Sequence, residues 1–199
     1  DIHAATGSLM FEVPINQVTP DMRRVAKVLN FGVIYGLSPH GISQQTGFSR
    51  EEGVNFIETY FSKYPGIQAY LEQVKAKTRE VQYVETLLGR RRHLPEINAA
   101  NFNVRGAAER MAINMPIQGT AADIMKLAMI RVHRRLEQEK LRSKMLLQVH
   151  DELVFEVPQE ELEALKRVVL DEMPAALEPR ELDVTLKVDT KWGPTWGDM

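Results

Sequence analysis

Apolar residues recur mostly with a helical period up to about residue 140, whereas beyond it most segments alternate apolar with polar residues. Positions three and four apart predict helices, and strict alternation predicts strands. The predicted helices begin at Pro20, Pro39, Arg50 and Pro65, and cover about 101–114, 121–140 and 159–173. The predicted strands lie at 81–87, on both sides of residues 150–152, and at 182–188, where LDVTLKV alternates.

Proline, glycine and hydroxyl residues predict where these elements end. Thr19-Pro20-Asp21 is typical of a helix start, and Gly36 of a helix stop near Tyr35. Pro116 lacks an N–H and disfavours helix at the residue before it, so we expect a break there and a new helix capped by Thr120. The order predicts an α+β fold, a helical lobe attached to a small antiparallel sheet.

Composition excludes several classes of protein. The 199 residues include no cysteine, which rules out disulfides and thiolate metal sites and fits a reducing, cytoplasmic setting. No run of about 18 apolar residues is present, so we expect no membrane span. The first residues, DIHAATGS, lack a signal-peptide pattern and an initiator Met, and we therefore expect a fragment of a longer chain.

Charge is distributed unevenly. Residues 1–150 carry 20 Lys and Arg against 14 Asp and Glu, whereas residues 151–199 carry 5 against 13. The basic part is suited to a polyanion, although an acidic C-terminal region that is merely solvated would give the same imbalance. Both interpretations stay open on charge alone.

The stretch RRVAKVLNFGVIYG, residues 23–36, places chemistry on one helix face. At about 100° per residue, Arg23, Lys27, Phe31 and Tyr35 fall within about 120° of each other, opposite an apolar face. Cations followed by aromatic rings are suited to a nucleoside triphosphate, with the phosphates at the cations and a sugar or base on a ring. A plain amphipathic surface helix is the alternative.

The stretch QVHDELVF, residues 148–155, places His150, Asp151 and Glu152 between two apolar strands. Carboxylate oxygens are the ligands that Mg²⁺ prefers. The stretch is either a solvated hairpin turn or half of a metal site.

These segments resemble family A DNA polymerases, the family of bacterial DNA polymerase I. The helix at 23–36 is similar to their motif B, R-x-x-x-K-x-x-x-F-x-x-x-Y-G, and QVHDE to motif C, the palm hairpin with a catalytic Asp. GRRRHLP at 89–95 and ERMAINMPIQGTAADIMKLAM at 109–129 are similar to family segments in the same order. The resemblance implies a partial right-hand fold, with residues 1–18 joining palm to fingers, 19–80 forming fingers helices and 81–199 the C-terminal palm.

The resemblance implies a deoxynucleotide site on the helix at 23–36. Arg23 and Lys27 would hold the phosphates, and Lys27 would also act as an acid toward the departing pyrophosphate. Phe31 would pack on the sugar and base, and Phe here resembles members that discriminate against dideoxy sugars. Tyr35 would lie at the templating position, and His3 would contact the triphosphate.

The resemblance also implies metal and DNA contacts. Asp151 would bind catalytic Mg²⁺, of which the complete enzyme uses two ions, with Glu152 as an accessory carboxylate and His150 near the primer end. The remaining implied contacts to primer–template DNA are Arg24, Arg90, Arg91, Arg92, Arg110, Asn114 and Gln118.

Two sets of these implied DNA contacts also have a physical rationale. Asn114 and Gln118, with Arg110 near the primer end, would donate to minor-groove acceptors, which are present at every base pair. The arginines at 90–92 would contact phosphates without reading sequence. The alternatives are hydrogen bonds around Pro116 for the first group, and pairing with the acidic C-terminal region for the second.

One family motif is absent. Motif A, D-Y-S-Q-I-E-L-R, would supply a second metal-binding Asp, and no such string occurs in residues 1–199. We expect it just before Asp1, in an N-terminal part that would be a partner of this chain, and we expect the chain alone to be inactive. Two other functions are considered, a fragment of a single-subunit RNA polymerase and a non-catalytic nucleic-acid-binding module.

Overall fold

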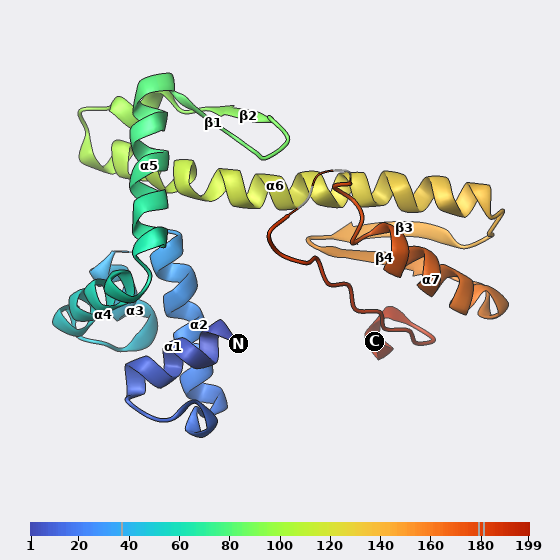
Figure 1. The fold of residues 1–199 in the computed structure, drawn as a ribbon, viewed down its shortest axis with the longest axis horizontal. Helices are drawn as coiled ribbons and strands as arrows, with labels where there is room; N and C mark the ends of the chain where they lie inside the picture. Colours follow the sequence, from blue (N-terminus) through green and yellow to red (C-terminus); the bar gives the residue numbers. More distant parts are fainter. Residues whose placement is uncertain (37, 179, 181) are drawn as a thin grey trace. The chain divides into compact units, whose positions relative to one another are not determined.

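The computed structural model describes residues 1–36, 38–178, 180 and 182–199 (Figure 1). The chain divides into two compact units. Unit 1 comprises residues 1–85 and 89–116, and unit 2 comprises residues 86–88 and 117–199. The helix α6 (Phe102–Gln138) contributes its first part to unit 1 and its second part to unit 2.

Unit 1 is mostly helical. Two short strands, β1 (Tyr83–Glu85) and β2 (Arg91–His93), form an antiparallel hairpin in which Val84 pairs with Arg92. The helices that precede this hairpin are α1 (Ile2–Phe11), η1 (Ile15–Gln17), α2 (Pro20–Ile34), α3 (Pro39–Thr46), α4 (Arg50–Lys63) and α5 (Pro65–Val81). The short helix η2 (Pro95–Asn98) lies between β2 and α6 in the sequence.

The helix starts in unit 1 follow from local sequence. The Thr19 hydroxyl accepts from the Met22 N–H at the start of α2. Ser49 and Glu52 form a reciprocal capping box at the start of α4. Gly47 ends α3 with φ 77°, a left-handed conformation that costs glycine little. The predicted helix starts at Pro20, Pro39, Arg50 and Pro65 are confirmed.

Two apolar clusters hold unit 1 together. One joins α2, α3 and α4 through Leu29, Val33, Ile42 and Tyr60. The other joins the β1–β2 hairpin and its following turn to α6, and it consists of Val84, Leu94, Ile97, Ala108 and Ala112. Burial of these side chains supplies the main favourable free energy of the unit.

Unit 2 packs a second hairpin and a helix against the later part of α6. Strands β3 (Lys144–Val149) and β4 (Glu152–Glu156) pair antiparallel, with a bulge between Met145 and Leu147. They are followed by η3 (Gln159–Glu161), α7 (Leu162–Glu172) and η4 (Trp196–Asp198). Met145 and Phe155 from the hairpin lie against a core made of Val132, Leu136, Leu165, Val168 and Val169.

The predicted break at Pro116 is wrong. The helix α6 continues from Phe102 to Gln138 with Pro116 inside it. Buried side chains occur before the proline, such as Ala112, and after it, such as Val132, so tertiary packing outweighs the roughly 3 kcal/mol that an interior proline costs. Thr120 does not cap a helix, because its hydroxyl accepts from the Leu87 N–H at 2.9 Å.

One further prediction fails near the C-terminus. Residues 182–188 form no strand, because they pair with neither β3 nor β4 and alternation alone does not supply partners for the backbone N–H and C=O groups. Beyond this stretch, Trp192 and Trp196 are 64% and 52% exposed. Val188 is the residue of the alternating stretch that packs on the core.

Candidate active site

The outward face of α2 carries the cations and rings that the sequence placed there. Arg23, Lys27 and Phe31 are exposed, while Leu29 and Val33 on the opposite face are buried. The Phe31 and Tyr35 rings are stacked, with centroids 5.9 Å apart and planes at 17°. Phe31 remains 42% exposed, so its ring is accessible to a ligand beside the cations.

The helix α1, which the sequence did not predict, brings His3 to this face. The His3 ring lies 5.6 Å from the Phe31 ring, tilted by 49°. Partial burial, then the charges of Arg23 and Lys27, lower the pKa of His3 below its ordinary value. Burial and the neighbouring cations both favour the neutral form of the imidazole over the charged form.

Two buried polar residues support His3, and the sequence analysis missed both. Asn30 Nδ2 lies 3.0 Å from His3 Nδ1, and the Thr6 hydroxyl donates to Asn30 Oδ1 at 3.0 Å. Thr6 and Asn30 are each only 2% exposed. The sequence feature that could have indicated this arrangement is Asn30 itself, a polar residue on an otherwise apolar helix face with Leu29 and Val33.

Asp1 connects the start of α1 to the cations of α2. Its carboxylate accepts from the His3 and Ala4 N–H groups, capping α1. The same carboxylate accepts from Arg23 Nε at 2.7 Å. This pair is roughly half exposed on both sides, so its contribution to stability is small, on the order of 0–1 kcal/mol.

The second candidate site lies at the tip of the β3–β4 hairpin. His150 adopts a left-handed backbone conformation, φ 53°, and its carbonyl accepts from the Gln148 side chain at 2.8 Å. Val149 pairs with Glu152 across the turn, which leaves Asp151 and Glu152 exposed. The turn therefore presents two adjacent carboxylates to solvent.

The donor set at this tip fits part of a magnesium site. Asp151 and Glu152 supply oxygen ligands of the kind that Mg²⁺ takes. Within the described residues, no group of three or more His, Asp or Glu side chains is placed to hold a metal ion. Asp151 is therefore suited to be one ligand of a site that other residues complete.

Arg110, Asn114 and Gln118 follow each other at intervals of four along α6. Asn114 Oδ1 is buried and has no hydrogen-bond partner among the residues that the structure describes, which is costly unless another group pairs with that side chain. A Cβ added at Gly36 would lie 3.5 Å from Arg110 Cγ, so the end of motif B approaches Arg110 closely. The structure thus brings Arg110 to the end of α2.

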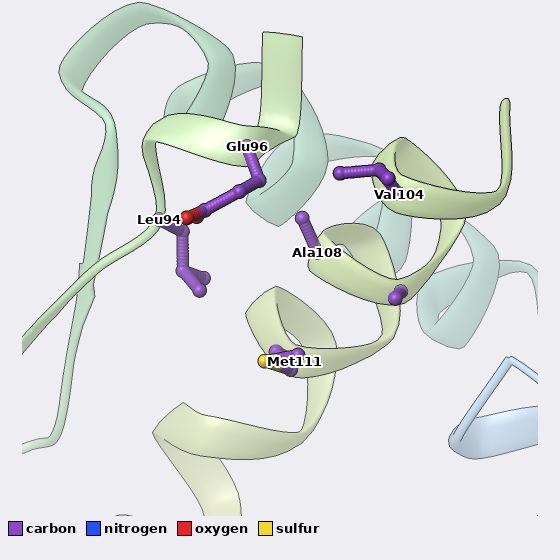
Figure 2. A pocket seen from close by; sticks show the side chains of 6 residues that line it. Leu94, Glu96, Val104, Ala108 and Met111 are labelled. Atoms are coloured by element: carbon purple, nitrogen blue, oxygen red, sulfur yellow. The ribbon is translucent and has the colours of Figure 1, made fainter. Parts of the chain in front are cut away.

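The arginines at 90–92 do not form one cluster. Arg91 Nε lies 3.2 Å from Glu85 Oε2 within the same hairpin. Arg92 extends from the other face of the strand, where its guanidinium lies 3.2 Å from Met111 Sδ. Met111 also lines a pocket of about 300 Å³ together with Leu94, Glu96, Val104 and Ala108. Figure 2 shows these side chains.

Comparison with known proteins decides the family. The family model described as "DNA polymerase family A" matches residues 1–198. The chain belongs to DNA polymerase family A. Among curated family relatives, DNA polymerase I of Bacillus caldotenax is 50% identical over 198 residues, 100% of this chain and 22% of the relative. DNA polymerase I of Bacillus subtilis is 48% identical over 198 residues, again 100% and 22%.

A solved family structure is also similar. The POL domain of Pol1 from M. smegmatis, in complex with DNA primer-template and dNTP, matches with TM-score 0.88 and 46% identity. The match covers 94% of this chain and 32% of that chain. The chain thus spans about a fifth of the length of the curated family relatives it matches.

These comparisons confirm the family that the two motifs indicated and the α+β fold of a partial polymerase. The roles of the individual family A side chains stay predictions. Among the residues that the structure describes, no helix has both the length and the apolar character needed to cross a bilayer.

Proposed function

We propose that this chain forms the fingers and part of the palm of a DNA-directed DNA polymerase, which adds deoxynucleotides to a primer 3′ end. Residues 19–80 would be the fingers, 1–18 the segment leading to them and 81–199 the C-terminal palm. The supporting observation is the α2 face, where His3 joins Arg23, Lys27 and Phe31. A bacterial, cytoplasmic setting and a part in replication and repair belong to the same proposal, since the named relatives are bacterial DNA polymerases I.

Each residue on the α2 face has a distinct task in this proposal. Arg23 and Lys27 bind the phosphates of the incoming nucleotide by charge-assisted hydrogen bonds. Lys27 then donates a proton to the pyrophosphate as charge develops on it. The Phe31 ring packs on the sugar and base, and Tyr35, stacked on Phe31, lies toward the templating base. The neutral His3 imidazole donates a hydrogen bond to the triphosphate.

Asp151 would hold the magnesium ions together with a carboxylate outside residues 1–199, and Glu152 would assist. Bound magnesium supplies activation of the 3′-hydroxyl and stabilisation of the leaving oxygen. Asp151 presents its carboxylate from a turn whose strands are fixed by the unit 2 core, through Met145 and Phe155. His150, next to it, would lie near the primer end.

DNA contacts in this proposal come from α6, the β1–β2 hairpin and α2. Arg110, Asn114 and Gln118 donate to minor-groove acceptors, which checks pair geometry without reading sequence. The hairpin arginines and Arg24 contact phosphates. Arg24 forms an exposed ion pair with Asp21 at 3.5 Å, a weak interaction that a phosphate would readily replace.

A direct test uses a chimera in which residues 1–199 replace the matching segment of a curated relative. We expect the chimera to extend a primer with deoxynucleotides and Mg²⁺, and to prefer them to ribonucleotides. The 199-residue chain alone should not extend the primer, because one aspartate does not hold two ions in register. A chimera that incorporates ribonucleotides equally well would favour the RNA polymerase alternative, and extension by the chain alone would contradict the incomplete metal site.

A further inference from the structure

The interior contact between α1 and α2 contains a polar chain. Asn30 lies on the buried face of α2, beside Leu29 and near Ala26 and Val33, which are all apolar. Burying an amide costs free energy unless its hydrogen bonds are made. Asn30 makes them with Thr6 on one side and His3 on the other. Packing alone would be served better by an apolar side chain at this position.

The hydrogen bonds have a defined direction. The Thr6 hydroxyl donates to Asn30 Oδ1, which turns the amide NH₂ group toward His3. An amide nitrogen carries protons and accepts none, so Nδ2 donates to His3 Nδ1 at 3.0 Å. Nδ1 therefore carries no proton, and in the neutral ring the proton is on Nε2.

The outer nitrogen of the ring is thereby made a donor. His3 is adjacent to Phe31 and in the field of Arg23 and Lys27, the residues that would meet the phosphates. A phosphate oxygen accepts hydrogen bonds and donates none when ionised, so a ring with its acceptor nitrogen outward would repel it. The single hydrogen bond from Asn30 Nδ2 to His3 Nδ1 therefore fixes both the tautomer and the orientation of the ring.

We propose that Asn30, held by Thr6, is a positioning residue that keeps the His3 imidazole in the Nε2–H tautomer for donation to the triphosphate of the incoming nucleotide. This inference rests on the proposed function for its ligand. The tautomer itself is a property of the 199-residue chain and is measured without nucleotide or DNA.

Two matched substitutions of Thr6 and one of Asn30 test the chain of bonds. Thr6→Ser keeps the hydroxyl, so His3 should retain the Nε2–H form. Thr6→Val keeps the volume but removes the donor, which frees the amide to turn its oxygen toward His3 and should yield an Nδ1–H population. Asn30→Asp places a carboxylate beside Nδ1, so His3 should protonate there and its pKa should rise above that of the unsubstituted chain.

The readout is the pair of imidazole ¹⁵N chemical shifts of His3 as a function of pH, assigned with a His3→Gln chain. Far-ultraviolet circular dichroism checks that each variant is folded. If Asn30→Asp does not fold, the comparison of Thr6→Ser with Thr6→Val decides alone. Identical His3 shifts in Thr6→Ser, Thr6→Val and the unsubstituted chain would overturn the proposal, because a merely structural role leaves the tautomer unchanged.

The functional arm uses the chimera and single-nucleotide incorporation. Thr6→Val should raise KM for the deoxynucleotide by about fivefold, the effect of one hydrogen bond, with kcat changed less than KM. In a His3→Ala background the same substitution should have no further effect, since its target is gone. An equal rise in KM in both backgrounds would overturn positioning through His3. A chimera that fails to extend a primer would contradict the proposed function and leave the tautomer measurement standing.

Discussion

The Arg91 guanidinium lies over the Tyr83 ring, with Cζ 4.5 Å from the ring centroid, in the β1–β2 hairpin. The register places Glu85 opposite Arg91, and the two side chains form an ion pair at 3.2 Å. Arg92, the next residue, extends from the opposite face of the strand toward Met111. Arg91 and Arg92 are consecutive in the sequence, but their side chains therefore lie on two different faces of the hairpin.

This pairing leads to a prediction for the proposed contact between the hairpin and DNA. Glu85→Gln should release Arg91 for a phosphate and strengthen binding of a primer–template duplex to the chimera, most clearly at low salt. Arg91→Gln should weaken binding for all sequences alike and reduce the salt slope by about 1. Fluorescence anisotropy over a salt series measures both effects. Glu58→Gln, which removes the same charge from α4, is the control, and an equal gain from it would contradict the role of the pair.

The carboxylate of Glu161 predicts an acid-sensitive contribution to stability in unit 2. The Arg142 N–H, the Ser143 hydroxyl and the Ser143 N–H all donate to it, and these bonds lower the pKa of Glu161 to about 2. A carboxyl with a depressed folded pKa stabilises the fold above its unfolded pKa, about 4.3, and loses this contribution as the pH falls through its folded value.

Replacing Glu161 by Gln should therefore lower the free energy of unfolding most above about pH 5, and the deficit should shrink as the pH falls toward 2. Urea unfolding followed by circular dichroism at several pH values measures this. Glu163→Gln removes the same charge from the exposed first turn of α7, where the carboxylate pairs with Lys166, and serves as the control. A Glu161→Gln deficit that does not change with pH would contradict the hydrogen-bonding account.

The contact between α3 and α4 depends on Gly53. A Cβ at this position would lie 3.0 Å from the Pro39 carbonyl oxygen, which is backbone and cannot turn aside. Overpacking of about 1–3 kcal/mol should exceed the roughly 1 kcal/mol that alanine adds through helix propensity, so Gly53→Ala should lower the free energy of unfolding by up to about 2 kcal/mol. Gly66→Ala, in α5, meets nothing within 4 Å and should raise it by up to about 1 kcal/mol through helix propensity. Equal thermal shifts for the two variants would show that α3 does not pack closely on α4.

The helices α2, α3 and α4 were predictable from the sequence because their ends are encoded locally. Thr19 with Pro20, and Ser49 with Glu52, satisfy the free N–H groups of the helices they start. The break predicted at Pro116 was wrong because the free-energy cost of one interior proline is small compared with the free energy gained by burying side chains on both sides of it. The strand predicted at 182–188 was wrong because alternation shows only which residues could face a core. A strand also needs a neighbouring strand to pair with its backbone N–H and C=O groups.

The α2 face was predictable for the same reason, since helical spacing alone places Arg23, Lys27 and Phe31 together. The interior side of the site was not. Thr6 and Asn30 are 24 positions apart, and their hydrogen bond depends on how α1 packs on α2. No periodic pattern indicates α1 itself, because its apolar and small residues form no helical stripe. Sequence spacing therefore predicts the outward face of the site, whereas the buried Thr6–Asn30 contact depends on long-range packing.

We propose that Asp151 is a metal-binding catalytic residue and not merely part of a solvated turn. The most direct measurement is the single-turnover rate of deoxynucleotide incorporation by the chimera carrying Asp151→Asn. The rate should fall at least about a thousandfold, the size of a lost charge interaction of several kcal/mol, while duplex binding is retained. Glu152→Gln, the adjacent carboxylate on the same turn, should cost about tenfold or less. An Asp151→Asn rate within twofold of the unsubstituted chimera would contradict the claim and favour a non-catalytic nucleic-acid-binding module.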